Sequence, residues 1–291
     1  MKAETSRRLL SLAAIASVVV LGPLTACAPQ SEGAATTASP GAGEGCVPAH
    51  AFPTLADGVL TIVAGESPVN FHSETPQGPY TGISYELVSE FAAENCLSLD
   101  VTLGTAGGSQ LALQEGQADL MVTMAIATPE RKQVFNLSDR ILFEGMGIVS
   151  SDGSYKTVED LKGRQIGVQT GASWGAQLRE LYGGDVIEYS DLASLGADVK
   201  AGRLDAAAVS SQAGLTLLHG LEMVLVEDDD DYPGLTATYD FVWPSTKGND
   251  DLTAALNEYI AHVQEGGTLK TILFESGVPD EFIDFYLNGR P

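Results

Sequence analysis

Apolar positions in the first half of the chain alternate between strand spacing and helix spacing. The pattern predicts, in order along the chain, strands at 59–63, 99–103 and 119–124, and helices at 82–96 and 110–117. The first of these helices has one apolar face, formed by Ile83, Leu87, Val88 and Phe91. Strands and helices that alternate in this way are typical of an α/β fold with a mainly parallel sheet.

The same pattern restarts after an extended segment at 141–151. Thr157 and Asp160 have the spacing of a capping box, with Asp in place of Glu, and open a short helix. The second series consists of strands at 165–169, 185–189, 205–209 and 223–226, and helices at 173–182, 192–201 and 212–219. The helix at 173–182 has one apolar face, formed by Trp174, Leu178 and Leu181. Two α/β units in succession predict two lobes.

The last part of the chain returns to an extended segment, at 238–243. Asn249 caps the helix that follows, and Gly266-Gly267 ends it. The apolar face of that helix is formed by Leu252, Leu256, Ile260 and Val263. Two further helices are predicted at 268–275 and 279–287.

Arg131 follows the predicted strand at 119–124 by a few residues. The ring of Pro129 disfavours a helical conformation at Thr128 and suits the start of a helix. Arg131 is therefore expected just beyond the end of a strand, where ligands of α/β sheets bind. A guanidinium held there is a bidentate receptor for a carboxylate or a phosphate, whereas the alternative is a surface arginine in a loop.

The charge of the chain excludes several classes of partner. Its 291 residues contain 15 basic and 39 acidic side chains, which disfavours both nucleic acid and polybasic binding to anionic lipid. We expect no metal or other cofactor, because the four histidines lack ligand spacing and the acidic run at 227–231 lacks the glycine of a calcium loop. That run is interpreted as a solvated loop. A hydrophobic content of 44% is enough to form a core.

The first residues have the composition of an export signal. Lys2, Arg7 and Arg8 precede an apolar segment at 9–21, and Leu24-Thr25-Ala26-Cys27 resembles the bacterial lipobox, in which the cysteine is acylated and becomes the new N-terminus. We therefore expect a signal peptide at 1–26, a lipid on Cys27, and a location on the extracytoplasmic face of the cell membrane. Removal of three basic residues and one acidic residue leaves a formal charge of −26. Residues 27–45 form the expected flexible tether.

Two cysteines remain once Cys27 carries the lipid. In an exported protein Cys46 and Cys96 most simply pair with each other. A disulfide across a loop of this length stabilises the fold by about 4 kcal/mol in the chain-entropy model.

A series of ordered motifs resembles family 3 solute-binding proteins, the extracytoplasmic receptors of polar amino-acid ABC importers. The motifs are Gly58-Val59-Leu60-Thr61-Ile62-Val63, Gly82-Ile83-Ser84-Tyr85-Glu86-Leu87, Leu113-Gln114-Glu115-Gly116-Gln117-Ala118-Asp119-Leu120, Thr128-Pro129-Glu130-Arg131, Leu137-Ser138-Asp139, Val158-Glu159-Asp160-Leu161-Lys162-Gly163-Arg164-Gln165-Ile166-Gly167-Val168-Gln169, Lys200-Ala201-Gly202-Arg203-Leu204-Asp205-Ala206 and Lys247-Gly248-Asn249. The resemblance covers the chain from about Leu60 to Leu273.

The resemblance implies an α/β fold of the periplasmic-binding-protein type II, with two mixed sheets flanked by helices and joined by two hinge strands. Lobe 1 is then expected at 46–140 and 242–291, lobe 2 at 146–237, and the hinges at 141–145 and 238–241. It also implies a monomer that binds an amino acid or amino-acid-like carboxylate between the lobes and delivers it to permease subunits. No enzymatic activity is expected.

The resemblance also assigns roles to residues of the cleft. Arg131 inherits the role of holding the α-carboxylate of the ligand. The turn Gly171-Ala172-Ser173 adds backbone donors at a helix N-terminus, which is an anion site on physical grounds as well. Main-chain groups of Thr123 and Met124 are expected to line the floor of the same cleft.

Several positions depart from the family pattern. Ser210 stands where the family has the carboxylate that pairs with the α-amino group of the ligand, and a hydroxyl cannot neutralise an ammonium in a closed cleft. The usual hydroxyl beside the arginine aligns with Ile126, the aromatic platform with Ala106, and the lobe 2 threonine with Ala172. These departures suggest a ligand that has a carboxylate but is not an ordinary free α-amino acid.

Other residues would have to supply the missing carboxylate for the α-amino group and the missing aromatic wall of the cleft. Glu66 or Glu86 is a candidate for the anion, and Phe71, Tyr85 or Trp174 for the wall. Each of these side chains has an ordinary alternative, as a solvated carboxylate or as a core aromatic.

Three rival functions stay open. Gly171-Ala172-Ser173-Trp174-Gly175 matches the G-x-S-x-G of a hydrolase nucleophile elbow, with Ser173 as nucleophile, but no oxyanion motif precedes it. Exported dehydratases with a cleft carboxylate share the fold of the resembling family. A sensor without transport is the third alternative.

Overall fold

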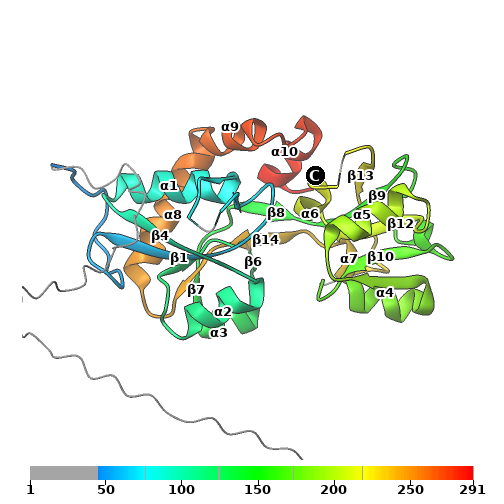
Figure 1. Cartoon of the computed structure of the whole chain (residues 1–291), viewed down its shortest axis with the longest axis horizontal. Helices are drawn as coiled ribbons and strands as arrows, with labels where there is room; N and C mark the ends of the chain where they lie inside the picture. Colours follow the sequence, from blue (N-terminus) through cyan, green and yellow to red (C-terminus); the bar gives the residue numbers. More distant parts are fainter. Residues whose placement is uncertain (1–44, 76, 124, 173, 218, 291) are drawn as a thin grey trace, which may run out of the picture. The chain divides into compact units, whose positions relative to one another are not determined.

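The computed structural model describes residues 45–75, 77–123, 125–172, 174–217 and 219–290 (Figure 1). The expected signal peptide, the lipidated Cys27 and the tether up to residue 44 lie outside the described residues. Met124 and Ser173 lie outside them as well.

The first sheet forms the centre of lobe 1. Its strands, in spatial order, are β4 (Ser98–Gly104), β1 (Val59–Gly65), β5 (Leu120–Met121), β15 (Pro244–Thr246) and β7 (Phe135–Leu137). Strand β1 is parallel to β4 and β5, whereas β15 is antiparallel to both of its neighbours. Successive side chains of β1 point to opposite faces: Leu60 and Ile62 join the largest core cluster, and Val63 joins a smaller one with Leu113.

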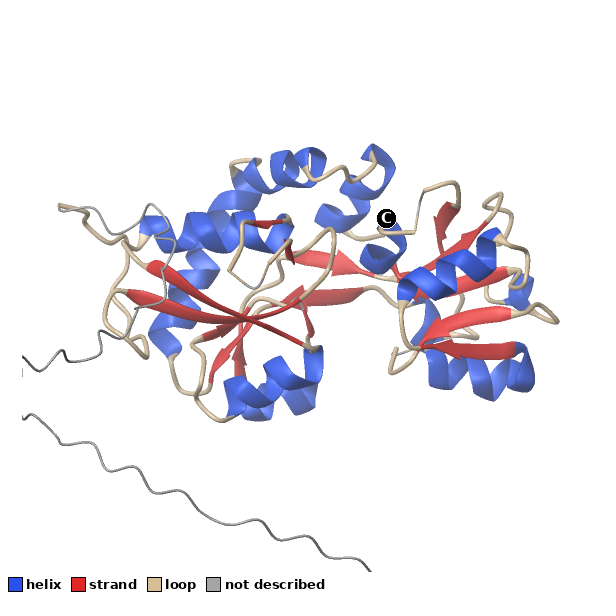
Figure 2. Ribbon diagram, in the orientation of Figure 1, coloured by secondary structure: helices blue, strands red, loops and turns tan. Residues whose placement is uncertain are grey.

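The second sheet forms the centre of lobe 2. Its strands, in spatial order, are β11 (Val186–Tyr189), β10 (Ile166–Gln169), β12 (Ala206–Ser210), β9 (Met146–Ser150) and β13 (Glu222–Leu225). Helices cover both faces of it (Figure 2). Strand β10 shows why small residues are needed here: a Cβ on Gly167 would lie 2.6 Å from Leu204, and Val168, on the other face, packs on Gly175 of α4.

A third sheet connects the segments between the two lobes. It consists of β6 (Ala125–Ile126), β14 (Tyr239–Val242) and β8 (Leu142–Glu144), all antiparallel. Strands β8 and β14 fall within the two extended segments that the sequence predicts as connections. Tyr239 of β14 is in register with Glu144 of β8.

The remaining elements surround these sheets. The helices are α1 (Ile83–Glu94), α2 (Ala106–Gln114), α3 (Pro129–Val134), α4 (Gly175–Tyr182), α5 (Leu192–Lys200), α6 (Ser211–Leu215), α7 (Pro233–Thr236), α8 (Asp250–Glu265), α9 (Thr268–Glu275) and α10 (Asp280–Asn288). Two short 3-10 turns, η1 (Glu159–Leu161) and η2 (Gly183–Asp185), and the hairpin of β2 (His72–Ser73) and β3 (Tyr80–Thr81) complete the fold.

Local signals in the sequence account for several of the helix starts. Asn249 caps α8 by accepting a hydrogen bond from the amide of Leu252 at 3.2 Å. The predicted capping box is reciprocal: the Thr157 hydroxyl accepts from the amide of Asp160 at 3.2 Å, and the Asp160 carboxylate accepts from the amide of Thr157 at 2.9 Å. It opens only the short turn η1, not an α-helix.

Three details of the predicted pattern are wrong. The strand expected at 119–124 is only Leu120–Met121, because the chain then turns away from the sheet toward β6. Helix α2 begins at Ala106, before the predicted start, because the Thr105 hydroxyl caps it by accepting from the amide of Gly108. Leu181 of α4 is 43% exposed, so the apolar face of that helix ends at Leu178.

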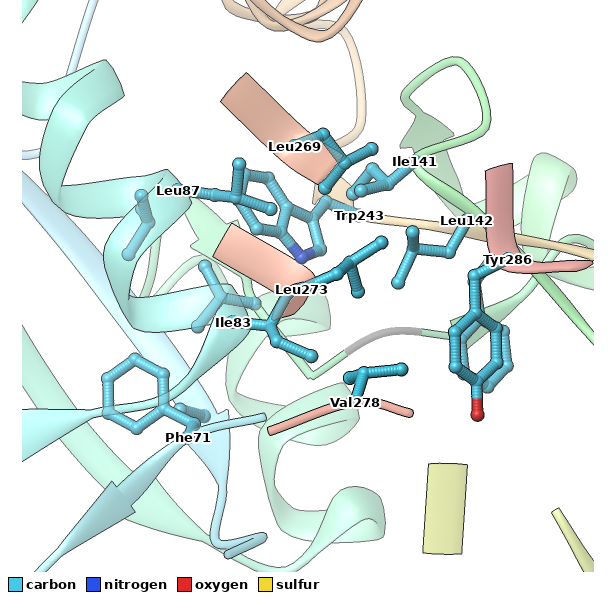
Figure 3. Close-up of a cluster of buried hydrophobic side chains, with 14 of the residues drawn as sticks. Phe71, Ile83, Leu87, Ile141, Leu142, Trp243, Leu269, Leu273, Val278 and Tyr286 are labelled. Atoms are coloured by element: carbon cyan, nitrogen blue, oxygen red, sulfur yellow. The ribbon is translucent and has the colours of Figure 1, made fainter. Parts of the chain in front are cut away.

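The largest core cluster contains residues of both lobes, and in lobe 1 it packs helices on one face of the sheet. The predicted inward face of α8 is fully buried, as are the predicted apolar residues of α1. Trp243, between β14 and β15, lies against this core with Leu269 and Leu273 of α9 and with Ile141 (Figure 3). Burial of a large apolar side chain of this kind stabilises the fold by roughly 1.5–3 kcal/mol.

The disulfide between Cys46 and Cys96 is present, with the Cα atoms 5.8 Å apart. It joins the segment before β1 to the residue that follows α1 and its C-cap. The pairing expected from the cysteine count is therefore found in the structure.

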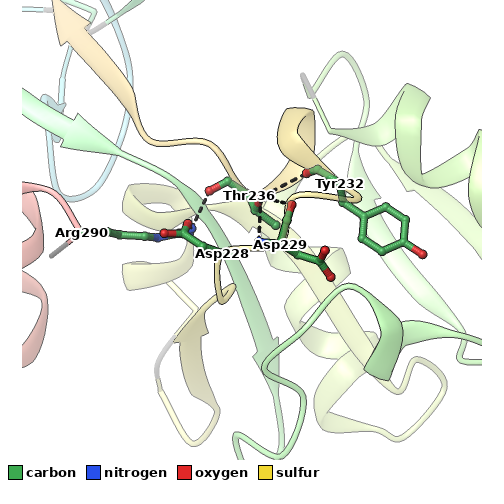
Figure 4. A network of polar contacts seen from close by, with 5 residues as sticks. All are labelled: Asp228, Asp229, Tyr232, Thr236 and Arg290. Atoms are coloured by element: carbon green, nitrogen blue, oxygen red, sulfur yellow. Dashed lines mark hydrogen bonds and ion pairs between the residues drawn. The ribbon is translucent and has the colours of Figure 1, made fainter.

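The acidic run at 227–231 is mainly exposed, as its composition predicts, but Asp228 and Asp229 have defined partners outside the run (Figure 4). Asp228 forms an ion pair with Arg290, whose guanidinium also donates to the carbonyl of Thr236. The Thr236 hydroxyl donates to the carbonyls of Asp229 and Tyr232, both at 3.1 Å. These contacts fix the loop before α7 against the C-terminal end of the described chain.

Candidate ligand-binding site

A cavity of about 370 Å³ brings together the candidate residues of both lobes. It is lined by Gly107, Gln110, Met121, Thr123, Ala125, Ile126, Arg131, Glu144, Gln169, Gly171, Ala172, Trp174, Val209, Ser210 and Phe241. These residues come from α2 and α3, from the ends of β5, β10 and β12 and the turns that follow them, and from the third sheet. Ligands of α/β folds bind at such strand ends, and the volume is within the range of small-molecule sites.

Arg131 is the one basic residue among the described residues that line the cavity. It lies in the first turn of α3, where the Thr128 hydroxyl accepts a hydrogen bond from its amide at 3.2 Å. Nη1 donates to the carbonyl of Ile126 in β6 at 2.6 Å. Burial lowers the pKa of Arg131, but a guanidinium stays protonated at neutral pH. The sequence signals at Thr128 and Pro129 therefore place a half-buried, oriented cation in the cavity.

Thr123 lies close to the end of β1. Its hydroxyl accepts a hydrogen bond from the amide of Gly65. The close approach favours glycine at that position, because a Cβ on Gly65 would lie 3.0 Å from the Thr123 hydroxyl oxygen, which is a tight contact. A hydroxyl that accepts in this way still has its proton to donate, so Thr123 can assist in binding an anion beside Arg131.

The turn after β10 supplies the lobe 2 side of the cavity. Gly171 has a φ of +80°, a conformation that favours glycine, and Ala172 follows it toward α4. Trp174 is 3% exposed and packs in the core cluster of lobe 2 with Leu178. Its ring therefore has both roles that the sequence leaves open, since it is a core aromatic and also lines the cavity.

Ser210 lies at the end of β12 and lines the cavity. Its hydroxyl accepts a hydrogen bond from the amide of Ala213 at 3.1 Å and so caps α6. Serine at this position thus has a structural reason. Its hydroxyl carries no charge that could balance a cation.

Replacement of Ser210 by Ala is expected to lower the free energy of unfolding by about 1 kcal/mol, because the amide of Ala213 loses its capping partner. Replacement by Asp, which caps equally well, should leave the free energy of unfolding within a few tenths of a kcal/mol of that of the wild type. Urea unfolding monitored by circular dichroism measures both. Equal stability of the Ala variant and the wild type would show that the cap contributes nothing.

Glu144 is a residue of this cavity that the sequence reasoning missed. It ends β8, and its side chain is fully buried. Oε1 accepts from the amides of Gly145 and Ser211, both at 2.8 Å, and from the Ser211 hydroxyl. Oε2 has no hydrogen-bond partner among the described residues. Burial raises the pKa of Glu144 to about 7, although the Ser211 hydroxyl and the amides of Gly145, Ser211 and Gln212 lower it.

Glu66 and Phe71, which were candidates from the sequence, do not line this cavity. Glu66 lines a separate pocket of about 550 Å³, and its Oε1 lies 3.3 Å from Nδ1 of His72. Phe71 is completely buried, with its ring centre 5.5 Å from that of Tyr80 and 5.7 Å from that of Tyr85. These aromatic residues form part of the lobe 1 core, which is the ordinary role of such side chains. Glu86 is exposed on α1.

Gln110, Gln169 and Phe241 also line the cavity without having been singled out from the sequence. Gln169 ends the predicted strand at 165–169, so strand ends alone could have identified it, whereas Gln110 begins a predicted helix and Phe241 lies within an extended segment. Glu144 had a different signal, because it is the lone charged residue in the apolar stretch 141–149. A charge in an otherwise buried stretch indicates a partner or a function.

Comparison with models of protein families identifies the family of this two-lobed chain. A model described as bacterial extracellular solute-binding proteins, family 3, matches residues 60–275. The chain belongs to this family. The resemblance drawn from the ordered motifs is confirmed.

Relatives of the family 3 chain have names that refer to amino acids. The L-cystine-binding protein TcyJ of Escherichia coli is 26% identical over 206 residues, which cover 69% of this chain and 76% of that protein. The lysine/arginine/ornithine-binding periplasmic protein of Escherichia coli is 24% identical over 211 residues, which cover 68% of this chain and 79% of that protein.

Solved structures share the fold. An ancestral arginine-binding protein bound to glutamine has a TM-score of 0.61 at 22% identity, covering 77% of this chain and all of that one. An amino acid ABC transporter substrate-binding protein from Streptococcus pneumoniae, bound to L-arginine, has a TM-score of 0.61 at 19% identity, covering 75% of this chain and 94% of that one. The expected type II periplasmic-binding-protein fold is confirmed.

Two features are absent from the described part of the chain, a membrane-spanning helix and a group of metal ligands. None of its helices has both the length and the apolar character needed to span a membrane. Within the same residues, no three His, Cys, Asp or Glu side chains come close enough together to hold a metal ion.

Proposed function

We propose that this family 3 protein is the extracytoplasmic substrate-binding component of an ABC importer, and that it binds an amino acid or an amino-acid-like carboxylate in the cavity around Arg131. The observation that carries the proposal is the half-buried Arg131 guanidinium, oriented by the Ile126 carbonyl at the end of the lobe 1 strands. A ligand carboxylate would replace water around the exposed edge of this fork and form a bidentate, charge-assisted pair.

The proposal also includes a membrane tether and a transport partner. Tethering through Cys27 and delivery to permease subunits follow from the lipobox-like tetrapeptide and from the family, whose relatives include a probable amino-acid ABC transporter-binding protein of Haemophilus influenzae. Strands β8 and β14 are the expected hinges, and closure of the two lobes around the ligand would present a surface for the permease to recognise. The protein would act as a monomer.

Binding of amino acids can be tested directly with the mature chain. We expect isothermal calorimetry with the twenty proteinogenic L-amino acids, L-ornithine and L-cystine to find at least one ligand with a micromolar or tighter dissociation constant. The protein should first be unfolded and refolded to remove ligand from the expression host. Absence of binding to every member of this panel would contradict the proposed ligand class.

An exported enzyme on the same fold is the second candidate function. One observation favours it: Glu144 is a buried carboxyl group in the cavity with a pKa of about 7, which suits general acid–base catalysis. One structural neighbour is titled an ancestral amino-acid-binding protein and precursor of cyclohexadienyl dehydratase. Mass spectrometry of the panel after long incubation with the protein distinguishes the two, since a binding protein leaves every compound unchanged.

A further inference from the structure

We propose that Glu144 is the group that binds the α-ammonium of the ligand, so that the cavity recognises a zwitterion between Arg131 and Glu144. This inference rests on the proposed function, and it names the ligand class of the same cavity. It differs from the expectation drawn from Ser210, which was that the ligand has a carboxylate but is not an ordinary free α-amino acid.

The hydrogen bonds of Glu144 are divided unevenly between its two oxygens. Oε1 accepts from two amides and from the Ser211 hydroxyl, whereas Oε2 has no partner within the described part of the chain. A buried carboxylate oxygen without a partner is costly, and such atoms are rare in native proteins. Because Glu144 lines the cavity, a donor supplied by the ligand would satisfy this atom.

The charges that line the cavity match a zwitterion. Arg131 and Glu144 are the only Asp, Glu, Lys or Arg residues among those that line it in the described chain. One cation and one anion in a single small cavity provide a receptor for each end of an amino acid. A ligand with a carboxylate alone would leave Glu144 without a cation to pair with and Oε2 without a donor.

The position of Glu144 also explains the departure at Ser210. Ser211, which holds Oε1 through its amide and its hydroxyl, is the next residue along the chain from Ser210. The Glu144 carboxylate therefore lies beside the end of β12, where the family pattern has its own carboxylate, but it comes from the hinge strand β8. Ser210 can then serve as the cap of α6 while the negative charge is kept in the cavity.

A purely structural role would account for one oxygen of Glu144 only. The bonds of Oε1 connect β8 to the start of α6, and they would be worth keeping in any fold. They leave Oε2 without a partner among the described residues, although Glu144 lines the cavity. Replacement of Glu144 by Gln separates the two roles, because Gln keeps an acceptor oxygen for Ser211 and removes the negative charge.

The experiment compares amino acids with their deaminated counterparts. The probes are L-glutamine with glutaramic acid, L-arginine with guanidinovaleric acid, and L-cystine with dithiodipropionic acid, measured by calorimetry on the mature chain. For the pair that the wild type binds, we expect the amino acid to bind at least about 30-fold more tightly than its counterpart. In Glu144→Gln the amino acid should lose at least about 30-fold, and the deaminated acid should change less than about threefold.

The matched control is Glu258→Gln, which removes the same charge from an exposed position on α8 and should leave every affinity unchanged. Thermal melting of each variant reports whether it is folded. If Glu144→Gln does not fold, the preference of the wild type for the amino acid over its deaminated counterpart tests the proposal. Glu144 is the one acidic residue among the described residues that line the cavity, so this preference reports on it.

Two results would overturn this inference and leave the proposed function intact. One is a wild type that binds the deaminated acid as tightly as the amino acid, and the other is a Glu144→Gln variant that binds the amino acid as the wild type does or loses both probes equally. A wild type that binds no member of the amino-acid panel would instead overturn the proposed function, and this inference with it.

Discussion

Replacement of Arg131 by Ala is expected to weaken binding of the wild-type amino acid about 1,000-fold, which corresponds to about 4 kcal/mol. The guanidinium is half-buried and is already oriented by the Ile126 carbonyl, so little entropy is lost when a carboxylate binds to it. In the Ala variant the ligand carboxylate would be buried in the cavity without a cation. Calorimetry at neutral pH measures the loss, and the far-ultraviolet circular dichroism of the variant should equal that of the wild type.

Replacement of Arg131 by Lys provides the matched control. Lysine keeps the positive charge but presents a point charge in place of a planar fork, so the variant should recover only part of the lost affinity. Neither variant should change the start of α3, because the Thr128 cap uses the backbone amide of residue 131. An Ala variant that keeps the wild-type affinity would show that the carboxylate is bound elsewhere in the protein.

The fold could be predicted from the sequence wherever local signals and burial agree. The alternating apolar runs predicted the strands β1, β4, β10 and β12, and the caps at Asn249 and Thr157 predicted where the following segments begin. The strand β5 could not be delimited in this way. Its apolar run continues past Met121, but the chain leaves the first sheet there to pair with β14, and pairing between distant strands has no local signal.

The residues of the candidate site also differ in whether local signals could predict them. Arg131 could be predicted because Thr128, Pro129 and the preceding strand fix its position through contacts within a few residues. Glu144 could not be predicted as a partner of Ser211, because the two residues are far apart in the sequence and meet only where β8 passes the start of α6. The aromatic candidates were ambiguous for another reason. Phe71 and Trp174 are both apolar enough to be buried, and only the packing distinguishes a core ring from one that also reaches the cavity.

Ser210 illustrates how a substitution at one position can mislead. Read alone, it removes the carboxylate that the family pattern has at the end of this strand. In the structure the hydroxyl caps α6, and a carboxylate from another element lies next to it. The charge of a cavity is a property of all the elements that line it, so a single aligned position does not determine the ligand class.

The second prediction with a large effect concerns stability, and it is independent of any ligand. Without ligand, the stability that Glu144 contributes is expected to fall by about 3 kcal/mol as the pH rises from about 4 to about 8, because burial raises the pKa of this carboxyl group from 4.5 to about 7. Between these values the unfolded chain has released the proton and the folded chain still holds it. The folded state therefore binds more protons, and the free energy of unfolding decreases with rising pH until Glu144 is ionised in both states.

The difference between wild type and Glu144→Gln isolates this contribution. Ionisable groups near Glu144 include Tyr239 of β14, Tyr286 of α10, Arg290 beyond the end of α10, and Arg131 in the same cavity, and none of these four is a carboxyl or an imidazole group. Other carboxyl groups with a raised pKa, such as that of Asp119, are present in both proteins and cancel in the difference. Urea unfolding at about pH 4 and about pH 8 should show the Gln variant gaining about 3 kcal/mol relative to wild type between the two conditions. If the difference in free energy of unfolding between the two proteins is the same at both pH values, Glu144 is ionised in the folded protein at ordinary acidic pH. Its Oε2 would then have a partner that stabilises the charge.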